Sequence, residues 1–301
     1  MSISRKKILS CSIVILTYND YDTTVNLLNT IKEFDLFKYI VIVDNCSMDG
    51  SYEKLQNYVN EKIILLRAPG NDGYSRGNNI GIKYLINNSD EDIICIANSD
   101  VEFEEVLVKN ILTVFEHHSE YCILAGLQVD PDGNVAPHPF WTEYSTAGWF
   151  RKILEGYRIL GRFLRINDTK KYINEKLSSS GPLIEVGAVE GSMFFIRKEE
   201  LKRIGLLDEG VWIYCEEDIL AKKMKRIGRK TGVLISDKYI HYGAKTTSKV
   251  FASFTKINHM FNSSIYYFNK YQSKNKFMQF VNYSLCLIKK VEDIIVKIIK
   301  D

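Results

Sequence analysis

The stretch SIVILTYNDYDTTVNLLNTI, residues 12–31, contains one complete strand-to-helix unit. It begins with the β-branched run Ser12–Leu16, which is typical of a buried strand. Asp22, Thr23 and Thr24 follow, and they can cap a helix. In that helix, Leu27, Leu28 and Ile31 share one face. This unit predicts an α/β protein in which strands alternate with helices.

Similar units recur along the chain. The other expected strands are Tyr39–Val43, Lys62–Leu66, Ile93–Ala97, Cys122–Leu127 and Val189–Ile196. The expected helices include Gly77–Asn87, Glu104–His117, Lys198–Ile204 and one that begins near Glu217. This alternation predicts right-handed crossovers and a mixed, mainly parallel, doubly wound sheet flanked by helices. In such sheets ligands bind outside the carboxyl ends of the strands.

Length and composition indicate a globular protein. The chain has 301 residues, of which 46% are hydrophobic, and this is enough for a packed core. Its 40 lysines and arginines nearly cancel its 37 acidic residues, so the net charge of +3 provides no overall field for nucleic acid. No apolar run reaches the length of a transmembrane span.

The cysteines and the amino-terminal residues indicate a cytoplasmic protein. The six cysteines are Cys11, Cys46, Cys95, Cys122, Cys215 and Cys286. They form no C-x-x-C pair, so we expect reduced, mostly buried thiols. The run MSISRKKILSCSIVIL leads into TYND without a small-residue cleavage site, which favours a first strand over a signal peptide.

Several common catalytic motifs are missing. No G-x-G-x-x-G follows the first strand, and no G-x-x-x-x-G-K-[ST] phosphate loop or G-x-S-x-G elbow occurs. Redox enzymes, nucleotide-hydrolysing motors and serine esterases are therefore disfavoured.

Four polar clusters are expected on one rim of the sheet. They are TYND at 17–20, DNCS at 44–47, NDGYSRGNN at 71–79 and NSD at 98–100. The first two can hydrogen-bond a heterocycle or ribose, although helix capping alone would also explain such residues. The third has glycines that allow close backbone approach, a helix start that favours anions, and Arg76.

Acidic residues provide the candidate metal and base groups. Asp100 follows a buried strand, where it can hold a divalent cation together with a diphosphate, or simply cap a helix. The triplet Glu216-Glu217-Asp218 starts a helix beside aromatic residues. Acids stabilise helix starts, but three in a row exceed that need, and one of them can act as a general base.

Taken together, these motifs resemble the family 2 glycosyltransferases, which have the GT-A fold. The matching segments are SIVILTYND, YIVIVDNCSMDGS, NDGYSRGNNIGI, ANSD and VEGSMFFIRKEELKRIGLLDEGVWIYCEEDILAKKMKRIGRKT. The resemblance covers roughly residues 10–245 and is strongest to rhamnosyltransferase-like enzymes of bacterial surface polysaccharide synthesis. It implies a glycosyltransferase domain over 1–245, with a nucleotide-sugar-binding half at 1–128 and an acceptor-side half at 129–245. A helical extension would occupy 246–301.

The resemblance also assigns roles to individual residues. Thr17 and Asp44 would contact the base, Arg76 and Asn79 would line the nucleotide pocket, Asn98 would face the ribose, and Asp100 with His241 would bind Mn²⁺ or Mg²⁺. The full expected nucleotide-sugar-binding set is Thr17, Tyr18, Asn19, Asp44, Asn45, Arg76, Asn79, Asn98, Ser99, Asp100, Glu190 and Gly191.

The chain departs from the family pattern at two points. The family's base is the second acid of an E-D pair, whereas this chain has three acids; the match favours Glu217, with Glu216 and Asp218 as the other candidates. Asn98 also replaces the first aspartate of a D-x-D motif. The lost carboxylate lowers the local negative charge, so we expect metal binding to depend on the donor.

These features predict an inverting, metal-dependent glycosyltransferase. It would move a sugar from a UDP- or dTDP-linked donor to a glycan or lipid-linked acceptor. A nucleotidyltransferase and a non-catalytic glycan-binding protein of the same fold remain the alternatives.

Two further segments fit more than one kind of packing partner. One is a basic helical segment with Phe150, Ile153, Leu154, Tyr157 and Leu160 at helical spacing among Arg151, Lys152, Arg158, Arg162 and Arg165. It fits a surface helix or a membrane-facing one. The broadly apolar tail Phe277–Ile299 fits core packing, a homodimer or peripheral contact with the inner face of the cell membrane.

Overall fold

The computed structural model describes residues 9–157, 167–179, 181–243 and 253–300. The strands are β1 Cys11–Thr17, β2 Phe37–Asp44, β3 Ile63–Arg67, β4 Ile93–Asn98, β5 Val101–Glu102, β6 Tyr121–Val129, β7 Phe140–Trp141, β8 Leu183–Val186, β9 Ala188–Val189, β10 Met193–Arg197 and β11 Lys230–His241. The helices are α1 Tyr21–Ile31, α2 Ser51–Leu55, α3 Tyr74–Asn88, α4 Glu105–His117, α5 Thr146–Glu155, α7 Asp168–Leu177, α8 Lys198–Arg203, α9 Glu216–Arg226, α11 Ser253–Tyr267 and α12 Lys276–Lys300. Short turns of helix, η1 Gln56–Tyr58 and η2 Phe268–Gln272, follow α2 and α11.

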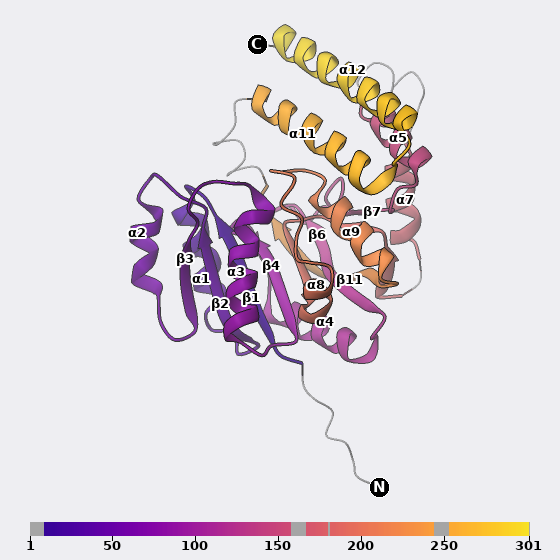
Figure 1. The fold of residues 1–301 in the computed structure, drawn as a ribbon. Helices are drawn as coiled ribbons and strands as arrows, with labels where there is room; N and C mark the ends of the chain where they lie inside the picture. The colour runs from indigo at the N-terminus through magenta and orange to yellow at the C-terminus, as the bar shows by residue number, and fades with distance from the viewer. Residues whose placement is uncertain (1–8, 158–166, 180, 244–252, 301) are drawn as a thin grey trace.

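The main sheet is mixed, as expected from the sequence. Its strand order is β3-β2-β1-β4-β10-β6-β11-β5, and β8 pairs with β11 (Figure 1). The first four strands of this order are parallel, β10 runs antiparallel to both its neighbours, and β11 runs parallel to β6. The chain leaves β1 toward β2 on one side and later returns to place β4 on the other. The carboxyl end of β1 is therefore a topological switch point, where ligands bind in sheets of this kind.

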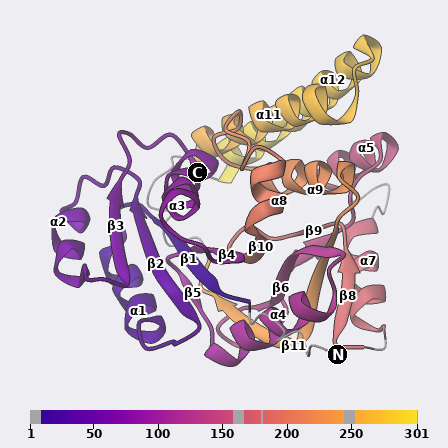
Figure 2. The same cartoon turned by 60° about the horizontal axis from the view of Figure 1, so that its bottom comes forward.

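Alternating side chains of the strands bury two apolar layers. In β1, Ile13 and Ile15 pack in the layer that contains apolar residues of α1 and α4. Val14 points the other way, into the layer shared with α3, α8 and α9. Figure 2 shows the two sets of helices on opposite faces of the sheet.

The expected strand Val189–Ile196 is wrong in one respect, because the structure divides it into β9 and β10. The residues between them form a turn in which Ser192 N donates to Glu190 Oε2 at 2.8 Å. The hydroxyl of Tyr74 fixes this turn by donating to the carbonyl oxygen of Gly191 at 2.6 Å. Because apolar residues lie on both sides of the turn, the hydrophobic pattern of the sequence predicts one continuous strand.

The segment between β6 and β10 contains α5, α7, β7, β8 and β9. The predicted basic helix corresponds to α5 in its first part. Its members Arg158, Leu160, Arg162 and Arg165 lie outside the described residues.

The carboxy-terminal helices α11 and α12 pack side by side at one side of the sheet (Figures 1 and 2). A third apolar cluster attaches them to α5 and to the start of α9, through residues such as Trp149, Cys215, Tyr267 and Phe268. Among the described helices, α12 included, none is both long and apolar enough to span a membrane. The six cysteines are all free thiols.

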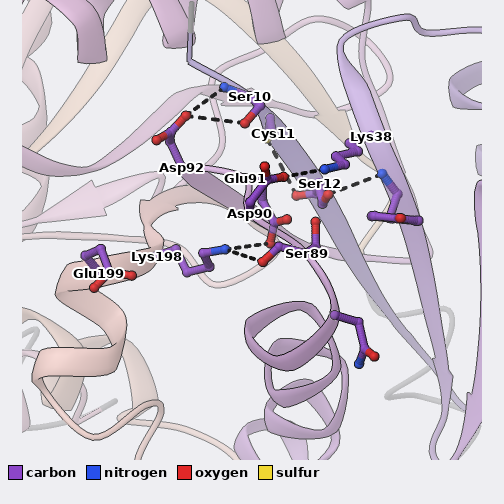
Figure 3. A network of polar contacts seen from close by, with 12 residues as sticks. Ser10, Cys11, Ser12, Lys38, Ser89, Asp90, Glu91, Asp92, Lys198 and Glu199 are labelled. Carbon is purple, nitrogen blue, oxygen red and sulfur yellow. Dashed lines mark hydrogen bonds and ion pairs between the residues drawn. The ribbon is translucent and has the colours of Figure 1, made fainter. Parts of the chain in front are cut away.

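A polar network fixes the amino ends of β1 and β4 to α8 (Figure 3). Asp92 Oδ2 accepts hydrogen bonds from Ser10 N at 3.2 Å and from Ser10 Oγ at 3.3 Å. Lys198 Nζ donates to the carbonyl oxygen of Ser89 at 2.9 Å and lies 3.6 Å from Glu91 Oε1. These charges therefore hold elements together, and they line neither of the two cavities described below.

Candidate active site

The carboxyl ends of β1, β2 and β4 open into a cleft of about 310 Å³. It is lined by Leu16, Thr17, Tyr18, Asn45, Asn71, Gly73, Tyr74, Asn98, Ser99, Asp100, Glu190, Gly191, Trp212, Ile213, Tyr214, Glu216, Glu217, His241 and Lys256. Eleven of these were expected from the sequence: Thr17, Tyr18, Asn45, Asn98, Ser99, Asp100, Glu190, Gly191, Glu216, Glu217 and His241. We call this space the donor cleft.

Asp100 and His241 meet at the floor of the donor cleft. Strand β11 pairs with β5 so that His241 lies opposite Val101, and this register places His241 Nε2 3.3 Å from Asp100 Oδ1. The side-chain amide of Gln128 holds the other ring nitrogen, Nδ1, at 2.7 Å. Burial alone lowers the pKa of His241, but the hydrogen bond and charge of Asp100 outweigh it and raise the pKa.

Several rim residues hold the loops together rather than facing the cleft with free polar groups. The Thr17 hydroxyl lies 2.8 Å from that of Thr24, inside the start of α1. Asn19 accepts from Met48 N at 2.8 Å through Oδ1. Ser99 Oγ donates to Asp20 Oδ2 at 3.0 Å, which ties the end of β4 to the end of β1.

Two buried oxygens at the end of β2 are unsatisfied. Asp44 is fully buried; its Oδ2 accepts from Ser47 N at 3.0 Å and lies 3.8 Å from Arg67 Nε. Asn45 Nδ2 donates to Asn71 Oδ1 at 2.9 Å. Within the described part of the chain, Asp44 Oδ1 and Asn45 Oδ1 have no hydrogen-bond partner. An unpaired buried acceptor is costly. Of the two residues, only Asn45 lines the donor cleft, so its Oδ1 is the oxygen better placed to receive an N–H group of a ligand.

Glu216 and Glu217 start α9 with raised pKa values. Burial and the charge of Glu190 raise the pKa of Glu216 to about 7, and its Oε2 has no hydrogen-bond partner among the described residues. Burial, together with the charges of Glu216 and Glu190, raises the pKa of Glu217 well above its usual value. A Cβ added at Gly191 would lie 2.9 Å from Glu217 Oε1, so a side chain at this position would shift the carboxyl. A carboxyl with a raised pKa is suited to proton transfer near neutral pH.

Asp218 is bound to other side chains instead. Its Oδ1 accepts from Trp141 Nε1 at 2.8 Å, and its Oδ2 accepts from Lys152 Nζ at 3.0 Å. The ammonium group of Lys152 also lies 5.0 Å from the ring centre of Trp149. Asp218 therefore anchors α9 to α5, and of the three candidate acids it has the least freedom to act as a base.

A second cavity of about 700 Å³ lies between α5, the start of α9, α11 and α12. Its walls are mainly apolar and aromatic, with Trp141, Tyr144, Trp149, Ile257, Met260 and Phe261 among them. Glu190 and Glu217 line both cavities. Glu217 is thus the one residue of the acidic triplet that reaches the donor cleft and this second space, which we call the acceptor cavity.

The sequence model described as glycosyl transferase family 2 matches residues 12–202. This chain belongs to that family. The resemblance inferred from the motifs is thereby confirmed.

Two curated relatives match this member of the family at low sequence identity. The low-salt glycan biosynthesis hexosyltransferase Agl10 of Haloferax volcanii is 27% identical over 209 residues, which cover 68% of this chain and 58% of the relative. The N-acetylglucosaminyl-diphospho-decaprenol L-rhamnosyltransferase of Mycobacterium tuberculosis is 26% identical over 231 residues, covering 73% and 71%. The chain therefore spans little more than half of the Haloferax protein. The second relative agrees with the expected rhamnosyltransferase-like branch.

Solved structures confirm the GT-A fold. GalNAc-T7 with UDP, GalNAc and Mn²⁺ superposes with a TM-score of 0.58 at 16% identity, over 78% of this chain and 44% of that one. Residues 1–349 of S. aureus TarS with UDP-GlcNAc give a TM-score of 0.55 at 15% identity, over 93% and 72%.

Arg76 and Asn79 of this glycosyltransferase do not line the donor cleft, in contrast to the role that the resemblance implied. Arg76 is half exposed and lies 3.9 Å from Asp72 and 4.0 Å from Glu209. Asn79 is buried and donates to the Leu207 carbonyl oxygen at 3.0 Å. Because the two positions lie three residues apart on α3, they share a face, and that face meets the loop before α9.

Two residues of the site were missed by sequence reasoning. Gln128 orients His241, and Lys256 in the first turn of α11 lines the donor cleft. Gln128 is a single polar residue in an apolar strand and belongs to no recognisable sequence motif. Lys256 lies beyond the segment that resembles the family, so neither residue had a local signal.

The possible metal-ligating side chains of the cleft fit a weakly held divalent cation. Within the described residues, no group of three or more His, Cys, Asp and Glu side chains is placed to bind a metal. Asp100 and His241 provide one carboxylate and one imidazole that converge on each other. The carboxylate suits Mn²⁺ or Mg²⁺, a neutral imidazole can add one nitrogen ligand, and the remaining ligands would come from substrate phosphates and water.

Proposed function

We propose that this glycosyltransferase transfers a sugar, with inversion, from a UDP- or dTDP-linked donor to a hydroxyl of a glycan or lipid-linked acceptor in bacterial cell-surface polysaccharide synthesis. The observation that carries this proposal is the position of Glu217, a carboxyl with a raised pKa that lines both cavities. A base between two binding spaces can take a proton from one substrate while that substrate attacks the other.

The donor cleft supplies recognition at its two ends. Asn45 lines the cleft, and the buried Asp44 precedes it at the end of β2. One of their unpaired Oδ1 atoms would accept a hydrogen bond from the single ring N–H of uracil or thymine. Asp100 and His241 would hold Mn²⁺ or Mg²⁺ beside the diphosphate. When bound, the cation would neutralise charge on the leaving nucleoside diphosphate.

Glu217 performs the proton transfer in this proposal. Its ionised carboxylate removes the proton from the acceptor hydroxyl, and the oxygen then forms a bond to the anomeric carbon as the bond to the diphosphate breaks. Attack from the acceptor cavity on the face opposite the leaving group inverts the anomeric configuration. Gly191 has no side chain and so leaves room for this carboxyl.

A donor screen tests the function directly. We expect thermal unfolding with Mn²⁺ to show stabilisation by UDP- or dTDP-sugars, and turnover with an acceptor to release a nucleoside diphosphate. Release of pyrophosphate would instead identify a nucleotidyltransferase. Binding of glycans with no turnover of any UDP-, dTDP- or GDP-sugar would identify a non-catalytic protein.

Helix α12 supports a membrane location for the acceptor, because its apolar face points outward. The side chains of Phe280, Leu287, Val291, Ile295 and Ile298 recur at helical spacing and are 40% to 67% exposed. Its inward face is more polar: Asn282 is buried and accepts from Trp149 Nε1 at 2.8 Å. The exposure of the outer stripe in the described part of the chain argues against core packing and for contact with an apolar partner.

The charge of these helices supports the partner that we propose. Residues 253–300 carry eight lysines and two acidic residues, a formal charge of +6 against +3 for the whole chain. A basic helix with an apolar outer stripe suits the anionic inner face of a cell membrane. The same charge would oppose a homodimer formed through this stripe. The active site would then face the cytoplasm beside a lipid-linked acceptor.

Acidic substitutions on the stripe test the membrane contact. We expect the protein to cosediment with vesicles that contain phosphatidylglycerol and much less with pure phosphatidylcholine vesicles. The double variant Val291→Glu/Ile295→Glu should lower the bound fraction by about tenfold, since it adds charge and removes apolar area. Val106→Glu on α4, at a similarly exposed apolar residue, is the control. Equal binding by both variants would contradict the proposal, and a dimer that the double variant dissociates would identify a second copy as the partner.

A further inference from the structure

The donor cleft is unusually acidic for a space that would receive a diphosphate. Four carboxyl groups line it, those of Asp100, Glu190, Glu216 and Glu217. Lys256 is the only lysine or arginine among the lining residues of the described chain. A doubly charged ligand in such a cleft needs positive charge close to it, because opposing carboxylates raise its free energy of binding.

Contacts along one face of α11 direct Lys256 toward the cleft. The ring of His259 stacks on Trp212, with ring centres 4.7 Å apart and planes at 26°. Ser263 Oγ donates to the Ile213 carbonyl oxygen at 2.7 Å. Positions 256, 259 and 263 are three and four residues apart, so they lie on one face of the helix. The Trp212 and Ile213 side chains also line the cleft, and this face of α11 is therefore fixed over it.

The sequence had assigned the phosphate charge to Arg76 instead. That guanidinium lies outside the cleft, beside Asp72 and Glu209. Lys256 has no competing ion pair of this kind in the described structure, and its side chain is exposed at the cleft.

We infer that Lys256 binds the donor diphosphate and stabilises the leaving nucleoside diphosphate. This inference rests on the proposed function, since it needs a nucleotide-sugar in the donor cleft. The ammonium group on α11 and the Asp100–His241 pair would then contact the diphosphate from two different elements. Lys256 thereby links donor binding to the helix that also forms a wall of the acceptor cavity through Ile257 and Met260.

Paired titrations separate a diphosphate contact from a general loss of the site. Isothermal titration with Mn²⁺ would compare UDP with UMP, or dTDP with dTMP where the donor screen selects thymidine. Lys256→Ala should weaken diphosphate binding by about tenfold and monophosphate binding by less than about twofold, since a charge-assisted hydrogen bond is lost only with the longer ligand. Lys256→Arg should retain most of the diphosphate affinity.

Lys274→Ala is the matched control, because this exposed lysine lines neither the donor cleft nor the acceptor cavity. It should leave both affinities unchanged. Thermal unfolding of each variant checks that the fold is intact. Equal weakening of both nucleotides by Lys256→Ala, or no change in either, would overturn the inference. A wild-type protein that binds no nucleoside diphosphate at all would overturn the proposed function as well.

Discussion

Glu217→Gln is expected to lower the turnover number by about 10²- to 10⁴-fold while donor affinity changes little. Glutamine keeps the size of the side chain beside Gly191, but it cannot accept a proton from the acceptor hydroxyl. Steady-state turnover and donor titration on the same protein would measure the two effects. Because the groups that we assign to the base and the diphosphate lie elsewhere in the cleft, donor binding should persist.

Because its pKa is raised, Glu217 should also control how kcat/KM depends on pH. Burial and the charges of Glu216 and Glu190 favour its protonated form, so the active carboxylate becomes more abundant as pH rises. We expect kcat/KM to increase with pH above the range in which an ordinary glutamate titrates, and Glu217→Gln to remove this dependence. The folded state also binds this proton more tightly than the unfolded state does. Its contribution to stability is therefore lost as pH rises, and Glu217→Gln should unfold at no lower temperature than wild type at about pH 8.

Neighbouring acids provide the controls for this assignment. Glu216→Gln should retain substantially more turnover than Glu217→Gln, because Glu216 does not line the acceptor cavity. Asp218→Asn should lower the unfolding temperature, since it weakens the contacts to Trp141 and Lys152. Near-normal turnover in Glu217→Gln combined with loss in Glu216→Gln would move the base to Glu216.

The rim of the sheet was predictable because it depends on local order along the chain. Parallel strands that alternate with helices bring their carboxyl ends to one edge, and this places Thr17, Asn45 and Asp100 together without any knowledge of side-chain contacts. The pairing of Asp100 with His241 came from the family resemblance alone. Its physical cause is the antiparallel contact between β5 and β11, which join residues far apart in sequence.

Features set by helix rotation and tertiary packing were not predictable from the chain. The sequence at Arg76 and Asn79 gives no sign of which α3 face meets the loop before α9. The apolar pattern of α12 is equally compatible with an inward stripe, and only the buried Asn282 shows that the helix is turned the other way. Lys256 reaches the cleft because α11 packs on Trp212, a contact that has no local signature.

Removal of divalent cations is the second large effect that we expect. EDTA should reduce turnover by at least about 10²-fold, and added Mn²⁺ should restore it. Without the cation, Lys256 would be the only described ammonium or guanidinium group in the cleft to offset the diphosphate charge beside four carboxyl groups. Asp100→Asn should cause a loss of similar size that excess Mn²⁺ does not recover.

Because the protein would supply only two metal ligands, Asp100 and His241, the site also predicts how the cation binds. With one carboxylate and one imidazole, the free protein should bind Mn²⁺ weakly, and UDP or dTDP should tighten the affinity by about tenfold or more by adding phosphate ligands. Linkage requires that Mn²⁺ tighten nucleotide binding by the same factor, so the two titrations check each other. Replacement of the first aspartate of the motif by Asn98 makes this mutual dependence stronger, because the protein supplies less negative charge of its own. Full turnover in EDTA, or equally tight Mn²⁺ binding with and without nucleotide, would remove Asp100 from this role.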